Sequence, residues 1–153
     1  MRKVMLIDRD REFCDTTASL LRDSYSTAIA TSVFEAMQML RENLPDVILL
    51  NYEMLEDGNT EWFDSVHLSG SKSGVPVIFL SDSNDRKMFM EALSKRPEWY
   101  ILKPPSRTKL IGEIEKALNK ERRDEYYMNI KAESTSRNDI SFEIDGLLKS
   151  MGL

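Results

Sequence analysis

The most informative segment of this sequence is Pro45-Asp46-Val47-Ile48-Leu49-Leu50-Asn51-Tyr52-Glu53-Met54-Leu55-Glu56-Asp57-Gly58. Its apolar run is too short for a helix and apolar at every position, which favours a strand buried on both faces. The run ends abruptly at Asn51 and a cluster of polar and acidic residues. Open α/β sheets carry their sites at the carboxyl ends of their strands, so we expect Asn51 at the tip of such a site.

The composition is typical of one ordinary globular domain. The chain has 153 residues, of which 41% are hydrophobic and 31% charged, enough to bury a real core. A net charge of −5 and a pI near 5.0 argue against a surface that binds nucleic acid by charge alone. The single Cys14 and the single His67 support neither a disulfide nor a metal cluster. No apolar run approaches a membrane span, so we expect a cytoplasmic protein without membrane contact.

Strand and helix patterns alternate along the chain. The expected strands are Val4–Ile7, Thr27–Thr31, Val47–Leu50, Val75–Leu80 and Trp99–Leu102. Expected helices cover residues 11–24, 32–44 (with Ser32 and Glu35 as a capping box), a segment around Trp62, Phe63 and Val66, residues 84–95, and a last helix from Ser106. This alternation predicts a doubly wound α/β fold with a five-stranded parallel sheet, because right-handed crossovers place helices on both faces.

Polar residues follow several of these strands and should meet at one edge of the sheet. They are Asp8 to Asp10 after the first strand, Asn51 after the third, Ser81 after the fourth and Lys103 after the fifth.

Four segments, taken in order and with their spacing, carry a resemblance to a known family: residues 4–8, 45–50, 76–81 and 100–104. Over residues 3–119 the chain resembles the receiver domain of bacterial response regulators, the CheY-like family. This implies a flavodoxin-like (βα)5 fold and a two-component signalling role. The family takes a phosphoryl group on an aspartate at the end of the third strand. Magnesium is held there with acids that follow the first strand, and a hydroxyl and a lysine contact the phosphoryl oxygens.

The resemblance assigns roles to several residues of the pocket, and the sequence departs from the family pattern at two pocket positions. The residues that match are Asp8 as the first acid, Ser81 as the hydroxyl, Lys103 as the lysine and Tyr100 as the switch aromatic. Asn51 stands where the phosphoryl acceptor should be, and Arg9 stands where the second acid should be. Both changes remove a carboxylate from the phosphorylation pocket.

The chemistry of these departures predicts the loss of phosphorylation. An amide is a poor nucleophile and cannot form the acyl phosphate that an aspartate forms. Magnesium prefers carboxylate oxygens, whereas Arg9 and Lys103 bring positive charge beside Asp8, so we expect no magnesium site and no other cofactor. Asp10 and Glu53 could supply replacement carboxylates. The alternative, which we favour, is that they neutralise Arg9 and Lys103.

The resemblance also implies a cis peptide bond between Lys103 and Pro104, against a base rate of roughly 5% for proline bonds. This bond would turn the lysine side chain into the pocket.

A partner surface is expected on the fourth helix and the fifth strand. Phe89, Ala92 and Leu93 have an inward spacing, which leaves Met88 and Met90 pointing elsewhere. Methionines outside the core stripe can form an adaptable surface for a protein partner. The family uses the face from the fourth to the fifth helix for partners and homodimers, and the resemblance adds Tyr100 to it. The other interpretation is that the methionines cover an edge of the core.

The chain continues past the receiver-like residues 1–119. We expect residues 120–133 to extend the last helix, residues 134–139 to form a linker and residues 140–153 to form an amphipathic helix. The apolar residues of that helix recur at helical spacing: Ile140, Ile144, Leu147, Leu148 and Met151. The stripe could pack on its own receiver, pair with its twin in a dimer, or open a missing output domain. Faintly, it resembles the first helix of the DNA-binding domain of sporulation-type regulators.

The sequence therefore predicts a pseudo-receiver module that signals through protein contacts without aspartyl phosphorylation and is not an enzyme. One alternative is the amino-terminal half of a transcriptional regulator whose DNA-binding domain is absent from this chain. A third is a phospho-receiver that uses another acid: Asp8, Asp10, Glu53 or Asp57. Because the chain supplies no helix-turn-helix, we expect no direct nucleic-acid binding.

Overall fold

The computed structural model describes residues 1–55, 60–67 and 74–119. Its strands are β1 (Lys3–Ile7), β2 (Ser26–Ala30), β3 (Val47–Asn51), β4 (Val77–Ser81) and β5 (Trp99–Leu102). Its helices are α1 (Arg11–Leu21), α2 (Val33–Glu42), α3 (Glu61–His67), α4 (Arg86–Ser94) and α5 (Arg107–Leu118), with a 3-10 turn, η1 (Tyr52–Leu55), after β3. The predictions for the helical extension, the linker and the tail helix fall on residues 120–153 and lie outside the described residues.

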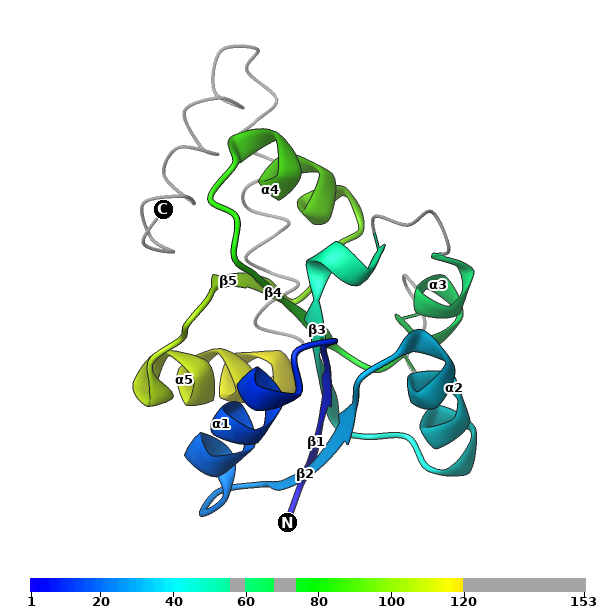
Figure 1. Ribbon diagram of the computed structural model, residues 1–153, viewed down its shortest axis with the longest axis vertical. Coiled ribbons are helices and arrows are strands. Elements are labelled where there is room, and N and C mark those ends of the chain that lie inside the picture. The colour runs from blue at the N-terminus through cyan, green and yellow to red at the C-terminus, as the bar shows by residue number, and fades with distance from the viewer. Residues whose placement is uncertain (56–59, 68–73, 120–153) are drawn as a thin grey trace.

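The five strands form one parallel sheet in the order β2-β1-β3-β4-β5. In Figure 1, α1 and α5 lie together on one side of the sheet and α2 and α3 on the other. Helix α4 packs against β5. The alternating pattern predicts this doubly wound parallel sheet and the resemblance implies its flavodoxin-like order, and both predictions are confirmed. None of the described helices is long and apolar enough to cross a bilayer.

The core is centred on β3 and β4. Residues Val47–Leu50 and Val77–Leu80 are all buried, as strands covered by helices on both faces must be. The ring of Phe79 lies between those of Tyr52 and Phe63, with centroids 5.0 and 5.5 Å away. This aromatic cluster joins the sheet to η1 and α3.

Side-chain caps set the starts of the helices. Ser32 accepts a hydrogen bond from the backbone N–H of Glu35, the cap that the sequence predicts for α2. Ser106 caps α5 in the same way, through the N–H of Lys109. Asp10 caps α1, which places this acid at a helix end.

Four element boundaries differ from the predictions by two or three residues. Helix α4 begins at Arg86 rather than at residue 84, because Asp85 caps it through the N–H of Lys87. Helix α1 ends at Leu21, whose carbonyl accepts from the N–H groups of Ser24 and Tyr25 in a closing turn. Helix α2 ends at Glu42, because Asn43 is already extended ahead of the proline at position 45. Strand β4 begins two residues later than expected, since the N–H of Val75 bonds to α3 rather than to a strand.

Two of the three residues predicted for the partner surface are less exposed than expected. Tyr100 does not lie on the surface, and Met88 is only partly exposed. Tyr100 is fully buried because its ring packs edge-on against Phe89, with centroids 5.3 Å apart. Met88 is half-buried and packs against the core. Met90 is 44% exposed, so it alone of the three lies on the surface.

Replacing Phe79 by alanine tests this core. The variant should lose about 3–5 kcal/mol of unfolding free energy, because the buried ring leaves a cavity between two other rings. Urea denaturation followed by circular dichroism measures the loss. Phe34→Ala is the matched control: this ring is 71% exposed, and its removal should change the free energy by no more than about 0.5 kcal/mol. Equal losses in the two variants would contradict the placement of Phe79.

Candidate functional site

The register of the sheet brings the polar strand ends together. Ile7 pairs with Leu50, so Asp8, the next residue, lies beside Asn51. Ser81 ends β4 and pairs with Leu102, so Lys103 follows directly. The chain order reverses between β1 and β3, and doubly wound sheets have their crevice at that point. The predicted residues therefore meet around the carboxyl ends of β1, β3, β4 and β5.

Both carboxylate oxygens of Asp8 are hydrogen-bonded. Oδ2 accepts from Nζ of Lys103 at 2.6 Å. Oδ1 accepts from Nδ2 of Asn51 at 3.2 Å and from the backbone N–H of Asp10 at 2.9 Å. The side chains of Asp8 and Lys103 are only 6% and 7% exposed, so this is a buried ion pair.

Lys103 is held by further contacts. Its Nζ lies 4.4 Å from the centroid of the Phe13 ring, within the range of a cation–π interaction. Its backbone N–H donates to the carbonyl of Ser81 at 2.8 Å. The peptide bond from Lys103 to Pro104 is cis, the configuration that the resemblance implies.

The ion pair corrects the sequence-based assignment of charges. We expected Asp10 and Glu53 to neutralise Arg9 and Lys103, but Lys103 pairs with Asp8; for Arg9 the expectation stays a prediction. Asp10 caps α1 through the N–H of Phe13, and Glu53 binds a hydroxyl. Arg9 is exposed, beside the buried Asp8. The candidate acid Asp57 lies outside the described residues.

A second cluster forms around Ser81. The side chain of Ser81 is fully buried, and its Oγ donates to Oε1 of Glu53 at 2.7 Å. Turn η1 places Glu53 there, with its N–H 3.3 Å from Oδ1 of Asn51 in an Asx-type contact. Oε2 of Glu53 is buried without a hydrogen-bond partner within the described part of the chain. Glu53 therefore turns one carboxylate oxygen toward the hydroxyl of Ser81.

Ser83 links this cluster to Tyr100. The backbone N–H of Ser83 donates to Oγ of Ser81 at 3.0 Å, and the hydroxyl of Tyr100 donates to the carbonyl of Ser83 at 3.1 Å. Sequence reasoning missed Ser83 because its role uses backbone atoms, which no residue pattern reports. It assigned Met88 to the partner surface, whereas the sulfur of Met88 lies 3.7 Å from the hydroxyl of Ser81.

The donor set does not fit a magnesium ion. Asp8 is engaged by a lysine and an amide, and Asn51 contributes one amide oxygen. Among the described residues no group of three or more His, Cys, Asp or Glu side chains could hold a metal. The nearby Cys14 donates its S–H to the carbonyl of Asp8, and burial, followed by the charge of Asp8, raises its pKa to about 11. A neutral thiol is a poor metal ligand.

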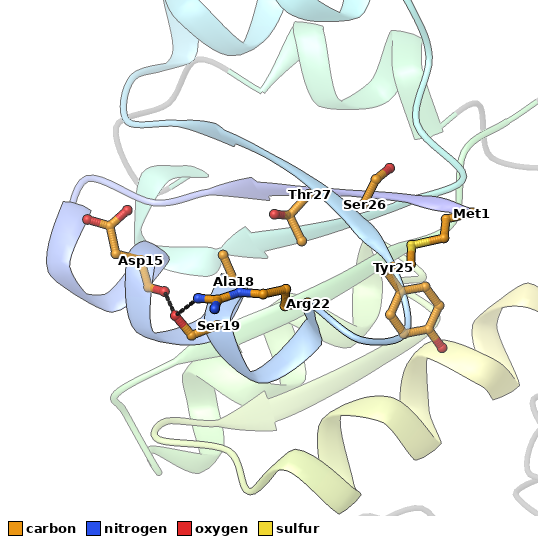
Figure 2. A pocket seen from close by; sticks show the side chains of 8 residues that line it. All are labelled: Met1, Asp15, Ala18, Ser19, Arg22, Tyr25, Ser26 and Thr27. Carbon is orange, nitrogen blue, oxygen red and sulfur yellow. Dashed lines mark hydrogen bonds between the residues drawn. The ribbon is translucent and has the colours of Figure 1, made fainter.

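A separate hollow of about 510 Å³ lies along α1 and β2. Figure 2 shows Asp15, Ser19, Arg22 and Tyr25 around it, with Arg22 donating to Oγ of Ser19. None of the residues of the predicted phosphorylation pocket lines this hollow.

The buried ion pair makes a testable contribution to stability. Lys103→Met leaves the carboxylate of Asp8 buried without its cation and should cost about 3–5 kcal/mol of unfolding free energy. Adding Asp8→Asn removes the uncompensated charge and should recover part of the loss. Arg11→Met, the control, breaks an exposed pair with Asp15 (63% and 61% exposed) and should cost less than about 1 kcal/mol. Urea unfolding measures all three variants, and similar losses for Lys103→Met and Arg11→Met would contradict the buried pair.

The comparisons with known proteins agree with this geometry. The family model described as "Response regulator receiver domain" matches residues 4–115. The transcriptional regulatory protein ZraR of Escherichia coli K12 is 26% identical over 116 residues, covering 75% of this chain and 26% of ZraR. The DNA-binding response regulator MtrA of Mycobacterium leprae is 25% identical over 120 residues, covering 78% of this chain and 52% of MtrA. The chain thus spans between a quarter and a half of these relatives.

Solved structures show the same fold. A response regulator from Desulfuromonas acetoxidans superposes with a TM-score of 0.67 at 21% identity, covering 78% of this chain and 98% of that one. A CheY-like receiver domain from Methanospirillum hungatei gives 0.64 at 17% identity, covering 81% and 98%. The family match over residues 4–115 shows that this chain belongs to the response regulator receiver domain family.

Proposed function

We propose that this chain is a pseudo-receiver: a signalling module that acts through protein contacts, without aspartyl phosphorylation and without catalysis of its own. The observation that supports this most is the state of Asp8. Its carboxylate is buried and bound to Lys103 at 2.6 Å and to Asn51 at 3.2 Å. In the family, the corresponding acid binds magnesium and the corresponding lysine contacts the phosphoryl group. Here Asp8 and Lys103 form an ion pair with each other.

The chemistry at Asn51 supports the same proposal. An amide at the tip of β3 cannot form an acyl phosphate. A magnesium ion would have to displace Lys103 from Asp8 and would gain only neutral amide oxygen from Asn51. Glu53 is the next carboxylate along the chain, and one of its oxygens already accepts from Ser81.

We further propose that Glu53 takes the place of the phosphoryl group as the acceptor for Ser81. In the family, as the resemblance implies, this hydroxyl contacts a phosphoryl oxygen. Here the hydroxyl donates to Glu53, and Ser81 is joined through Ser83 to the inward Tyr100. The module would then hold one internal state permanently, with its output set by which protein binds.

A second function is favoured by the relatives. ZraR is described as a transcriptional regulatory protein and MtrA as a DNA-binding response regulator, and this chain matches only part of each. We propose as the alternative that the chain is the receiver half of such a regulator. The mass of the native protein in its source cells distinguishes the two, since a regulator would be substantially longer than 153 residues. In either case Met90 and its neighbours on α4 remain our proposed partner or homodimer face.

The absence of phosphorylation is tested with acetyl phosphate and magnesium. The wild-type chain should show no mass increment of a phosphoryl group and no amide NMR shifts with beryllofluoride. The double variant Arg9→Asp and Asn51→Asp restores both missing carboxylates and is the positive control. Phosphorylation of the wild type at any aspartate would overturn the proposal. Silence of both proteins would instead place the defect in Lys103 and Asp8, whose ion pair the double variant leaves intact.

The role of Glu53 is tested by two substitutions. Glu53→Ala removes the acceptor of Ser81 and should shift the amide resonances of residues 81–85 and the ring resonances of Tyr100. Glu53→Gln keeps an acceptor oxygen at the same place and should leave those resonances close to the wild type. The proposal fails if Glu53→Ala leaves Tyr100 unchanged, or if both variants disturb it equally.

A further inference from the structure

A groove between α2 and α3 plays no part in the candidate site. Its volume is about 300 Å³, and its lining is mainly apolar. Met37, Leu40 and Leu44 line it from α2 and the residues just after that helix, and Trp62 and Val66 line it from α3. Leu44 is 56% exposed at the border of this groove. In Figure 1 the two helices lie side by side on the face opposite α1 and α5.

Trp62 gives this groove a specific requirement. Its side chain is 5% exposed, yet its indole N–H has no hydrogen-bond partner in the described part of the chain. Ser65, which also lines the groove, donates its hydroxyl proton to the carbonyl of Trp62 at 2.9 Å. A buried donor without an acceptor is costly. An apolar occupant of the groove would cover the exposed side chain of Leu44 and would complete the apolar surroundings of Trp62.

The chain itself carries a segment of this kind. The apolar stripe of residues 140–151 has five large side chains on one face if the segment is helical. With 12 residues it would be about 18 Å long, and α2, with 10 residues, is about 15 Å long. Glu143 and Asp145 flank the stripe and offer carboxylates to Arg41, an exposed residue that lines the groove.

The tether is long enough to reach the groove. The described helix α5 ends at Leu118, and 20 residues, 120–139, precede the stripe. Fully extended, they span up to about 70 Å. With residues 120–133 helical, the reach is still about 40 Å. A compact domain of this size is about 35 Å across, so either linker can pass to the opposite face of the sheet.

We propose that residues 140–151 form an amphipathic helix that docks into the α2–α3 groove of their own receiver domain. The stripe of Ile140, Ile144, Leu147, Leu148 and Met151 faces the groove. The receiver then carries its own ligand on the side away from α5. This proposal does not depend on the phosphorylation chemistry.

The test uses the full chain with a nitroxide at residue 150. Ser150→Cys places the label beside the stripe, and Cys14 stays unlabelled because it is fully buried and its thiol remains protonated at neutral pH. In ¹⁵N-labelled protein, the Trp62 indole N–H and the amide of Leu44 should lose most of their intensity relative to the reduced label. Trp62→Phe assigns the indole resonance, and the indole of Trp99 serves as an internal reference.

Two tail variants make the result specific. Leu147→Ser with Leu148→Ser removes the centre of the stripe and should restore the intensity of the Trp62 resonance. Lys149→Ser, on the opposite face of the same helix, is the matched control and should leave the broadening unchanged. Equal behaviour of these variants would overturn the proposal.

The remaining outcomes also decide the matter. Broadening centred on Met90 and α5 would place the tail on the other face and overturn the proposal. A second sample mixes chain that carries the nitroxide but no ¹⁵N with ¹⁵N-labelled chain that carries no nitroxide. This sample separates contacts between copies from contacts within one chain. Broadening of Trp62 in that mixture at the same level would assign the groove to a second copy and overturn the intramolecular docking. No broadening at Trp62 in any sample would overturn it as well.

Discussion

The buried ion pair between Asp8 and Lys103 is the interaction on which the rest of the site depends. Two charges with exposures of 6% and 7% have lost most of their hydration, and only close pairing with further hydrogen bonds offsets that cost. The structure supplies these contacts: a 2.6 Å ion pair, the amide of Asn51, the N–H of Asp10 and the ring of Phe13. A carboxylate held in this way is stabilised as a structural group and has little capacity left for a metal ion.

The topology explains how two residues 95 positions apart come to form this pair. Asp8 follows β1 and Lys103 follows β5, and the sheet order places β3 and β4 between these strands. A long side chain is needed to cross that distance. Asn51 at the tip of β3 lies on the way and donates to the same carboxylate. A parallel sheet is thus sufficient to gather the residues, while the lengths of their side chains decide which of them pair.

The sequence predicted more of the fold than of the pairing inside the site. An unbroken apolar run indicates a buried strand such as β5, and the bounds of β5, Trp99–Leu102, were predicted without error. The cap at Ser32 follows from a local pattern and was also found. Strand position alone, however, cannot say whether Tyr100 faces the core or the solvent, because both faces of β5 are covered and alternation is lost. In the same way, counting charges could not show that Lys103 pairs with Asp8 and not with Glu53. The pairing depends on how far the lysine side chain extends between the ends of the strands.

The hydrogen bonds around Ser81 extend this argument to the output side of the domain. A serine hydroxyl has one proton to donate, and at 2.7 Å a carboxylate oxygen is a much better acceptor than the methionine sulfur 3.7 Å away. The proton therefore goes to Glu53, which leaves the lone pairs of Ser81 to accept from Ser83 and so fixes the carbonyl that Tyr100 binds. Each step uses a buried group whose release would leave a donor or an acceptor unpaired, so the steps reinforce one another. A ligand that accepted a hydrogen bond from Ser81 would have to compete with Glu53 for a single proton. In the pseudo-receiver that we propose, the carboxylate at position 53, more than the amide at position 51, would therefore hold the internal state.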